Sequence, residues 1–470
     1  MFKPAFQKTA TAALALATAL AAAPAAQAQV SQLFGNGTYL FAPVTRTWLD
    51  CYGITVPSTN PRPSLCPTPI ENIQYFYAGT GSGAGIENFI QQNSKATGGL
   101  LELPPFLDPA TGVTSYPYTR PNGEIVPDFS MDAAVFTPTQ DGAYANLARR
   151  TRSKYWRLPV VAGTVGMPFS AAKDINGVGL PENLNLTRAQ YCDLWSGKVL
   201  NWSELNLLNA DGTSAGPGPN LPVVRVVRAD NSGGTYALTN HLTQACRDLD
   251  ADGVPESSYP WTEPFQERSI WGITEYPDNS PIISGNGAPR QLLTLISTPG
   301  AIGYVTAMAL DPFTADRPQA TSLQTGHSVH SIAKGGTVHQ FVQPNAMTAR
   351  TALTGVKDIY TISSSMRDSK QDGAYPITAP GFALLYCKYD AQGVAKVPQG
   401  VSQALKNFFG WALTADPDGQ MGTADDPVAD KLAATLLYSP LPNTLKAQSR
   451  KALSTIDTDR CTGSGPFGTH

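Results

Sequence analysis

The hydrophobic and polar positions along the chain predict strands and helices that alternate. Apolar, strand-like runs lie at residues 73–77, 158–165, 221–227, 301–305 and 381–389. Spacings typical of helices lie at residues 86–90, 187–198, 236–242, 291–297, 403–413 and 431–437. Thr187 is suited to cap the second of these helices. We therefore expect an α/β fold with mainly parallel sheets.

Two of the expected strand–helix junctions suit an anion. The strand at 221–227 leads into Arg-Ala-Asp-Asn-Ser-Gly-Gly-Thr at 228–235, and the strand at 73–77 leads into Gly-Thr-Gly-Ser-Gly at 79–83. A helix N-terminus offers backbone N–H groups, glycine lets a ligand approach closely, and arginine adds a planar fork of donors. We predict one anion between two helix N-termini. The alternative is a surface turn with an exposed arginine.

Other classes of protein that use similar loops fit less well. The glycine turn at 79–83 resembles a dinucleotide loop, but no acidic residue ends a second strand about 20 residues further on. Neither turn continues into the Gly-Lys-Ser/Thr of a phosphate-loop NTPase. The chain has five histidines and lacks the Gly-x-Ser-x-Gly spacing of a nucleophile elbow, which argues against a serine hydrolase.

The composition and the N-terminus limit the class of protein further. The 470 residues exceed one ordinary core, and a formal net charge of -3 without a Lys/Arg-rich block argues against nucleic acid as a partner. Lys3 and Lys8, an Ala/Leu-rich stretch at 10–23 and the Ala-Gln-Ala at 26–28 predict a signal peptide over residues 1–28. We expect a periplasmic or secreted protein, with no later membrane span.

Asp132 is the carboxylate of interest. A carboxylate inside an anion site repels most anions, but it can accept a hydrogen bond from phosphate, which carries a proton at neutral pH. Fully ionised sulfate has no proton to offer and would be repelled. The alternative for Asp132 is an ordinary loop or capping residue.

Seven segments together resemble the periplasmic phosphate-binding proteins of phosphate ABC transporters. They occur in the family order and cover about half of the mature chain. They include Asp-Phe-Ser-Met-Asp at 128–132 and the arginine motif at 228–235. The others are the segments at 35–43, 79–86, 194–202, 299–305 and 375–378. The resemblance implies a two-lobed periplasmic-binding-protein fold with a two-stranded hinge, no catalytic activity, and delivery of inorganic phosphate to a permease by a monomer.

The resemblance also implies roles for individual residues. Asp132 would accept the phosphate proton and Asp230 would brace Arg228. Phosphate oxygens would be held by Ser82, Arg228, Ser232 and Gly233. The family's Thr-Phe pair is replaced by Tyr39-Leu40, with Thr38 one position earlier, and the closing Thr by Gly234, with Thr235 one position later. Thr38, Tyr39 and Gly234 are therefore expected at the site, where these departures put the exact oxyanion in question. Another oxyanion, a phosphate ester, or an exported phosphoesterase on this fold is the alternative.

The lobes and disulfides follow from this reading. The first lobe would contain residues 29–165 and 306–470, and the second residues 166–305. Six cysteines in an exported chain favour disulfides, and pairs that stay within one lobe are Cys51–Cys66, Cys192–Cys246 and Cys387–Cys461.

Two acidic segments have carboxylates at alternate positions, as calcium loops do. The first contains Asp248, Asp250 and Asp252 with a glycine at its sixth position, but Tyr259 stands where a calcium loop has its bidentate glutamate. The second is Asp-Pro-Asp-Gly-Gln-Met-Gly-Thr-Ala-Asp-Asp at 416–426. Calcium is the cofactor expected here, although none is required for phosphate binding. Solvated acidic turns, or a calcium-dependent surface protein, are the alternatives.

Overall fold

A computed structural model of the chain describes most of its length. The described residues are 32–54, 62–92, 106–107, 114–115, 127–136, 140–144, 154–170, 172–247, 259, 282–310, 319–320, 322–331, 337–369, 371–389 and 400–463. The predicted signal peptide lies outside them. Among the described helices, none is long and apolar enough to cross a membrane.

The larger lobe, lobe I, is built on a seven-stranded sheet. The strand order is β14-β6-β18-β5-β1-β2, and β19 also pairs with β6. The strands are β1 (Gln32–Gly37), β2 (Gln74–Gly79), β5 (Phe129–Asp132), β6 (Tyr155–Gly166), β14 (Val305–Thr306), β18 (Thr378–Tyr386) and β19 (Tyr438–Pro440). Its helices are α2 (Ala42–Tyr52), α3 (Ser82–Gln91), α8 (Ala346–Leu353), α9 (Ile362–Met366), α10 (Val401–Ala412), α11 (Val428–Thr435) and α12 (Asn443–Leu453).

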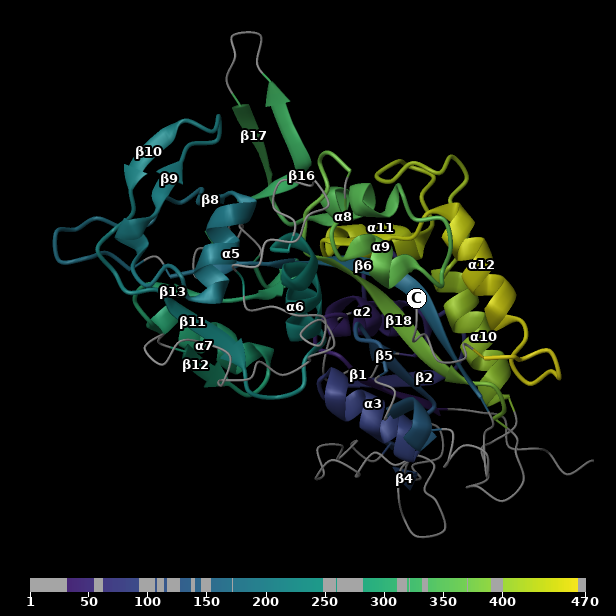
Figure 1. Ribbon diagram of the computed structural model, residues 1–470. Helices are drawn as coiled ribbons and strands as arrows, with labels where there is room; N and C mark the ends of the chain where they lie inside the picture. Colours follow the sequence, from purple (N-terminus) through teal and green to yellow (C-terminus); the bar gives the residue numbers. More distant parts are fainter. Residues whose placement is uncertain are drawn as a thin grey trace, which may run out of the picture.

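Lobe II, at the left in Figure 1, contains two five-stranded sheets. One has the order β12-β11-β13-β7-β15, with β7 (Pro168–Phe169), β11 (Val224–Arg228), β12 (Ile282–Gly285), β13 (Ala301–Ile302) and β15 (Gln319–Ala320). The other has the order β10-β9-β8-β16-β17, with β8 (Asn185–Leu186), β9 (Asn206–Leu208), β10 (Ser214–Pro217), β16 (Ser322–Ser331) and β17 (Thr337–Val342). The helices are α5 (Arg188–Ser196), α6 (Gly233–Ala245) and α7 (Ala288–Ser297), with the 3₁₀ turn η1 (Trp202–Glu204). A second 3₁₀ turn, η4 (Ala307–Leu310), follows β14 and packs mainly against β6 and β14 of lobe I. A separate hairpin pairs β3 (Phe106–Leu107) with β4 (Thr114–Ser115).

The α/β class is confirmed, but the sheets are mixed rather than mainly parallel. β1 runs parallel to β2 and β5, and β11 runs parallel to β12 and β13. The long strand β6, however, is antiparallel to β14, β18 and β19. The sequence prediction missed this because strands buried on both faces carry the same continuous apolar run in either direction.

Two of the segments that carry the chain between the lobes match the predicted hinge. β6 ends at Gly166 and β7 begins at Pro168, while β13 ends at Ile302 and β14 begins at Val305. β14 pairs with β6 and β13 pairs with β7, so the two crossing segments are neighbours. The predicted strand at 301–305 is therefore two short strands in different sheets.

One segment departs from the expected division into lobes. Strand β15 pairs with β7, and β16 pairs with β8. Residues 319–342 thus join the sheets of lobe II, whereas the sequence prediction placed everything after residue 305 in the first lobe. Figure 1 shows the β16–β17 hairpin extending beside the strands of lobe II. The mixed pattern at 325–375 gave no signal for this pairing, which depends on long-range contacts.

Local signals in the sequence agree with several elements. Thr187 caps α5, since its side chain accepts a hydrogen bond from the backbone N–H of Gln190 at 3.2 Å. The three predicted disulfides are confirmed: Cys51–Cys66, Cys192–Cys246 and Cys387–Cys461. The second of them joins the end of α6 to α5 and thereby holds the helix that begins at the arginine motif.

Candidate functional site

Three of the predicted site residues come together at one edge of the lobe I sheet. β1 ends at Gly37, just before Thr38, and β5 ends at Asp132. β2 ends at Gly79, three residues before Ser82 begins α3. Because these strands are parallel, their carboxyl ends meet at the same edge. Ligands of open α/β sheets bind at such edges.

Lobe I presents two buried polar atoms at this edge. Ser82 is 1% exposed and Asp132 is 0% exposed. Asp132 Oδ1 accepts hydrogen bonds from the backbone N–H groups of Ala133 at 2.6 Å and Ala134 at 3.1 Å. Asp132 Oδ2 and Ser82 Oγ have no hydrogen-bond partner among the residues that the structure describes. Buried polar atoms of this kind usually have one, so the pair points to a ligand that can both donate and accept.

Burial controls the charge of Asp132. It raises the pKa of this carboxyl to about 6, against smaller lowering effects from Ala134, Ser82, Arg157 and Ala133. Ser82 is thus near enough to influence the carboxyl, although the two side chains make no hydrogen bond of normal geometry. At neutral pH Asp132 is mainly ionised and can accept a proton-bearing ligand oxygen.

Lobe II contributes a positive charge that is held in place from three sides. Arg228 ends β11 and is 4% exposed. Its Nε donates to Asp230 Oδ1 at 2.8 Å, its Nη2 pairs with Asp230 Oδ2, and its Nη1 donates to Ser232 Oγ at 3.1 Å. Its backbone N–H donates to the hydroxyl of Tyr304 at 2.9 Å. Asp230 is therefore placed to brace Arg228, as the resemblance implies.

The same contacts keep Asp230 ionised. Burial alone would raise its pKa, but the hydrogen bonds and charge of Arg228 and the N–H of Gly287 bring the pKa below its ordinary value. Asp230 also accepts from Gly287 N at 2.9 Å. The ring of Tyr39 lies on another side of the arginine, with the guanidinium carbon 5.5 Å from the ring centroid. That distance is within the range of a cation–π contact.

Ser232 forms the N-cap of α6. Its Oγ accepts from the backbone N–H groups of Gly234 at 3.2 Å and Thr235 at 3.5 Å, in addition to Arg228 Nη1. The hydroxyl proton of Ser232 can still be donated. The helix therefore begins beside the arginine, and the positive end of its dipole adds to the positive charge of the guanidinium.

Gly233 is where the two lobes meet. A methyl group added at its Cα would lie 2.5 Å from Ser82 Oγ, 2.8 Å from Ala133 Cβ and 3.2 Å from Thr38 Oγ1. All three are atoms of lobe I, so the start of α6 lies directly against the edge that carries Ser82 and Asp132. A methyl group at Gly234 would find its nearest atom, Ser232 Oγ, at 3.5 Å. Of the two glycines, only Gly233 requires the absence of a side chain.

The departures from the family motifs have structural consequences. Thr38 Oγ1 accepts from the N–H of Leu40 at 3.1 Å, which leaves its hydroxyl proton available. Thr235 is fully buried, and its Oγ1 lies 2.6 Å from the hydroxyl of Tyr304. The hydroxyl of Thr235 is therefore directed at Tyr304, and we do not expect it to replace the missing family threonine at position 234.

Arg157 is a functional candidate that the sequence analysis missed. It lies on β6, is 5% exposed, and its guanidinium carbon is 3.4 Å from the ring centroid of Phe382. Its charge lowers the pKa of Asp132, while burial lowers its own pKa. The signal that could have identified it is an arginine directly before the apolar strand run at 158–165. Arginine is rarely buried unless it is paired, so this position indicates a buried charge that has a partner. Nothing in the local sequence relates Arg157 to Asp132, because the two residues lie on different strands, β6 and β5. These strands come close only because each pairs with one side of β18.

Two hollows lie between the lobes beside Arg228. A cavity of about 30 Å³ is lined by Arg228, Ser232, Gly234 and Tyr304, among others. A groove of about 700 Å³ runs between α2 and α7 and shares Tyr39, Val305 and Thr306 with the small cavity. The small cavity beside the arginine therefore borders a larger, mostly apolar groove.

The predicted calcium residues separate into two cases. Asp248, Asp250 and Asp252 lie outside the described residues. The second acidic segment is described, and three of its carboxylates lie close together.

Two lobes that close on a polar site beside two helix N-termini define a binding protein of the periplasmic type. The sequence matches the PBP superfamily domain over residues 22–416. The chain belongs to this superfamily, and the predicted resemblance to periplasmic phosphate-binding proteins is confirmed.

Curated relatives are 26–30% identical to this chain over the segments that align. The phosphate-binding protein PstS of Xylella fastidiosa (strain Temecula1) is 26% identical over 279 residues, which are 57% of this chain and 59% of the relative. PstS3 of Mycobacterium bovis (strain BCG) is 26% identical over 324 residues, 68% of this chain and 71% of the relative. Alkaline phosphatase L of Pseudomonas aeruginosa is 30% identical over 172 residues, 37% of this chain and 36% of the relative. The chain thus spans well under two thirds of two of these three relatives.

Solved structures agree in fold. A phosphate-binding protein from Stenotrophomonas maltophilia has a TM-score of 0.57 at 19% identity, over 93% of this chain and 99% of the other. The high-affinity periplasmic phosphate-binding protein PfluDING, solved with phosphate, has a TM-score of 0.57 at 15% identity, over 93% and 96%. The two-lobed periplasmic-binding-protein fold is therefore confirmed.

Proposed function

We propose that this protein is exported, captures inorganic phosphate between its lobes and delivers it as a monomer to the permease of an ABC transporter. The names of its relatives support this class. The observation that carries it is the pair of buried atoms Ser82 Oγ and Asp132 Oδ2, neither of which has a hydrogen-bond partner among the described residues. Ser82 Oγ lies against Gly233, the first residue of α6.

The donors and acceptors match a phosphate that carries a proton. Arg228, the hydroxyls of Ser82 and Ser232, and the N-terminus of α6 would donate to phosphate oxygens. Asp132 would accept the phosphate proton through Oδ2. Sulfate, which has no such proton, would leave Asp132 unpaired against a like charge. Closure would be favoured because the ligand bridges Ser82 and Asp132 of lobe I to Arg228 of lobe II.

Calorimetry on ligand-stripped mature protein tests this proposal. Phosphate should bind tightly and sulfate at least a hundredfold more weakly at neutral pH, because only phosphate satisfies Asp132. Equal affinity for the two anions would remove the role of Asp132. Absence of heat with phosphate would reject the phosphate proposal itself.

A phosphate ester is the second candidate, and the groove of about 700 Å³ favours it. A substituent on the phosphate could extend past Tyr39 into this groove, and the similarity to alkaline phosphatase L covers part of the chain. Competition between phosphate and a chromogenic phosphate ester distinguishes the ligands. We expect no hydrolysis, since we infer that the protein is not an enzyme; turnover that is lost in Ser232→Ala would contradict this.

A further inference from the structure

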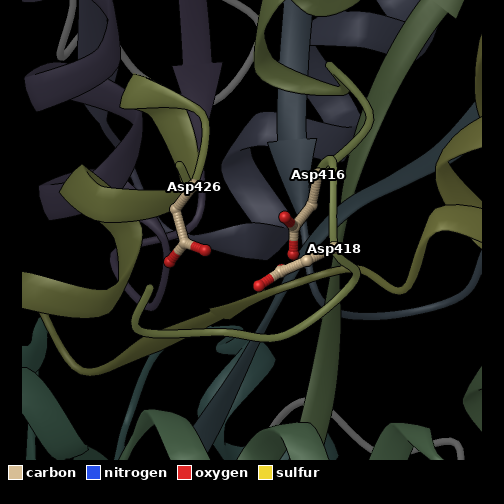
Figure 2. Close-up of side chains that lie close together, drawn as sticks. All are labelled: Asp416, Asp418 and Asp426. Atoms are coloured by element: carbon tan, nitrogen blue, oxygen red, sulfur yellow. The ribbon is translucent and has the colours of Figure 1, made fainter. Parts of the chain in front are cut away.

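A loop of lobe I at residues 413–427 brings three carboxylates together. It connects α10 to α11, and Figure 2 shows Asp416, Asp418 and Asp426 directed toward one another. One oxygen atom from each lies within 4.8 Å of the others. Gly419 and Gly422 have positive φ angles of 72° and 94°, which let the loop fold back on itself. Three like charges at this spacing repel unless something positive lies among them.

Asp416 gives the independent indication of a ligand. Asp416 is only 6% exposed, and its Oδ1 atom has no hydrogen-bond partner among the described residues. Asp426 is also buried, at 4% exposed. A buried carboxylate with one oxygen that lacks a donor is unfavourable when it is ionised, unless a cation compensates it. The side chain points into the cluster, so the compensating charge would have to lie there.

The basic side chains nearby are engaged elsewhere. Lys446 pairs with Asp430 and donates to Thr414 O at 2.8 Å. Arg350 donates to the carbonyls of Gly419 at 3.1 Å and Pro440 at 3.0 Å. Lys431 donates to Ala424 O at 2.7 Å. Each therefore hydrogen-bonds to the loop backbone or to a different carboxylate, and the charge of Asp416 acts on Arg350 and Lys446 only through space.

The loop is also anchored in a way that preserves its shape. Asn443, the first residue of α12, accepts from Asp416 N at 2.8 Å and donates to Asp416 O at 2.7 Å. Asp426 Oδ2 accepts from Gly422 N at 2.7 Å. The backbone of Asp416 and the carboxylate of Asp426 are thus held by contacts that do not depend on a metal ion. A site that is positioned in advance loses less entropy when it binds.

We propose that Asp416, Asp418 and Asp426 bind one calcium ion, which fastens the α10–α11 loop to the start of α12. All three side chains offer carboxylate oxygens, which are the ligands that calcium prefers, and the cluster has no nitrogen or sulfur ligand for zinc. Calcium accepts roughly six to eight oxygen ligands in a flexible geometry, whereas magnesium demands near-ideal octahedral geometry and gives up its waters reluctantly. The three carboxylate oxygens lie within 4.8 Å of one another, close enough to contact one calcium ion together.

The test uses the full mature chain with its disulfides intact, after treatment with a chelator and removal of the chelator. Calcium chloride and magnesium chloride are titrated separately by calorimetry, and Tm is measured with and without calcium. The variants are Asp416→Asn and Asp418→Asn. Asp418 is exposed, so its replacement should not disturb folding. The matched control is Asp425→Asn, an exposed carboxylate in the same loop that bonds to Thr423 instead of joining the cluster.

Calcium should bind at least tenfold more weakly to Asp416→Asn and Asp418→Asn and with unchanged affinity to Asp425→Asn. Calcium should raise the Tm of wild type and of the control, and raise it less in the two variants. A further variant, Asp250→Asn, changes the other acidic segment. It should still bind calcium at the cluster of Asp416, Asp418 and Asp426. No calcium binding up to millimolar concentration, equal preference for magnesium, or wild-type affinity in both variants would overturn the proposal. Phosphate affinity should be the same in all variants, so a failure here leaves the proposed function untouched.

Discussion

The two lobes contribute chemically different halves to the candidate site. In lobe II, Arg228 is bonded to Asp230, Ser232 and Tyr304, and each of these contacts is internal to the lobe. In lobe I, Ser82 Oγ and Asp132 Oδ2 are buried without partners among the described residues. One half is complete before it meets a ligand, and the other half is not.

The difference assigns a separate task to each half. A charge that its own lobe holds in position can attract any oxyanion of suitable size, because its donors are already oriented. Two unpartnered atoms, one of them an acceptor alone, are satisfied only by a ligand that offers a proton as well as acceptor oxygens. Affinity should therefore depend mostly on lobe II, and discrimination between oxyanions mostly on lobe I.

The largest effect should come from Arg228→Ala. The change removes the charge that would bond the anion and leaves the half-buried Asp230 with only the N–H of Gly287 as a partner, at a cost of about 2–5 kcal/mol in binding. Phosphate affinity should fall by a factor of roughly 30 to several thousand. Calorimetry measures this, with the exposed Arg290→Ala on α7 as the control. If both variants bind phosphate equally, lobe II does not supply the affinity.

Asp132→Asn should affect stability and discrimination together. Burial raises the pKa of Asp132 to about 6 in the folded protein, compared with about 3.9 when unfolded. The folded state therefore holds its proton more tightly, and the free energy of unfolding falls as pH rises from about 4 to about 6. Asparagine does not titrate, so the variant's free energy of unfolding should not fall in this pH range. Without ligand, Asp132→Asn should therefore be more stable than wild type at pH 7, by about 3 kcal/mol at most.

Chemical denaturation between pH 4 and 7 measures the stability change in Asp132→Asn. The exposed Asp459→Asn is the control and should follow wild type. Titration with phosphate and sulfate measures discrimination, and the gap between them should narrow at least tenfold. A variant that keeps the full wild-type preference for phosphate would show that lobe I does not select the anion.

Gly233→Ala tests the contact between the halves. The new methyl group would lie 2.5 Å from Ser82 Oγ and 2.8 Å from Ala133 Cβ, so the lobes could not close fully. Overpacking of this kind costs about 1–3 kcal/mol, which corresponds to about 5- to 150-fold in phosphate affinity. Gly234→Ala is the matched control, because its methyl group meets nothing closer than 3.5 Å. Equal affinities in the two variants would mean that the lobes do not meet at Gly233 when phosphate binds.

The smallest effect should come from Tyr304→Phe. This change removes the hydroxyl that accepts from Arg228 N and pairs with Thr235, but it keeps the ring. Leaving the buried N–H of Arg228 without a partner costs about 1–2 kcal/mol of stability. We expect a lower Tm and a loss of phosphate affinity of only a few-fold. A loss as large as that of Arg228→Ala would show that lobe II is less firmly positioned than its hydrogen bonds suggest.

Local chemistry made much of this protein predictable from its sequence. The cap at Thr187, the helix after Ser232 and the turn before Ser82 depend on neighbouring residues, and the structure contains all three. The disulfides were predictable because the motif order suggested which cysteines share a lobe. The candidate site residues could be named because they follow strands and begin helices, which is a local property. Their roles as phosphate ligands remain predictions.

Tertiary structure decided what no local pattern contains. The antiparallel partners of β6 and the pairing of β15 and β16 with lobe II join segments that are far apart in sequence. The approach of Gly233 to Ser82 and the effect of Arg157 on Asp132 depend on distances that only the folded chain sets. The physical reason is that hydrophobic periodicity reports which face of an element is buried, but not which element covers it.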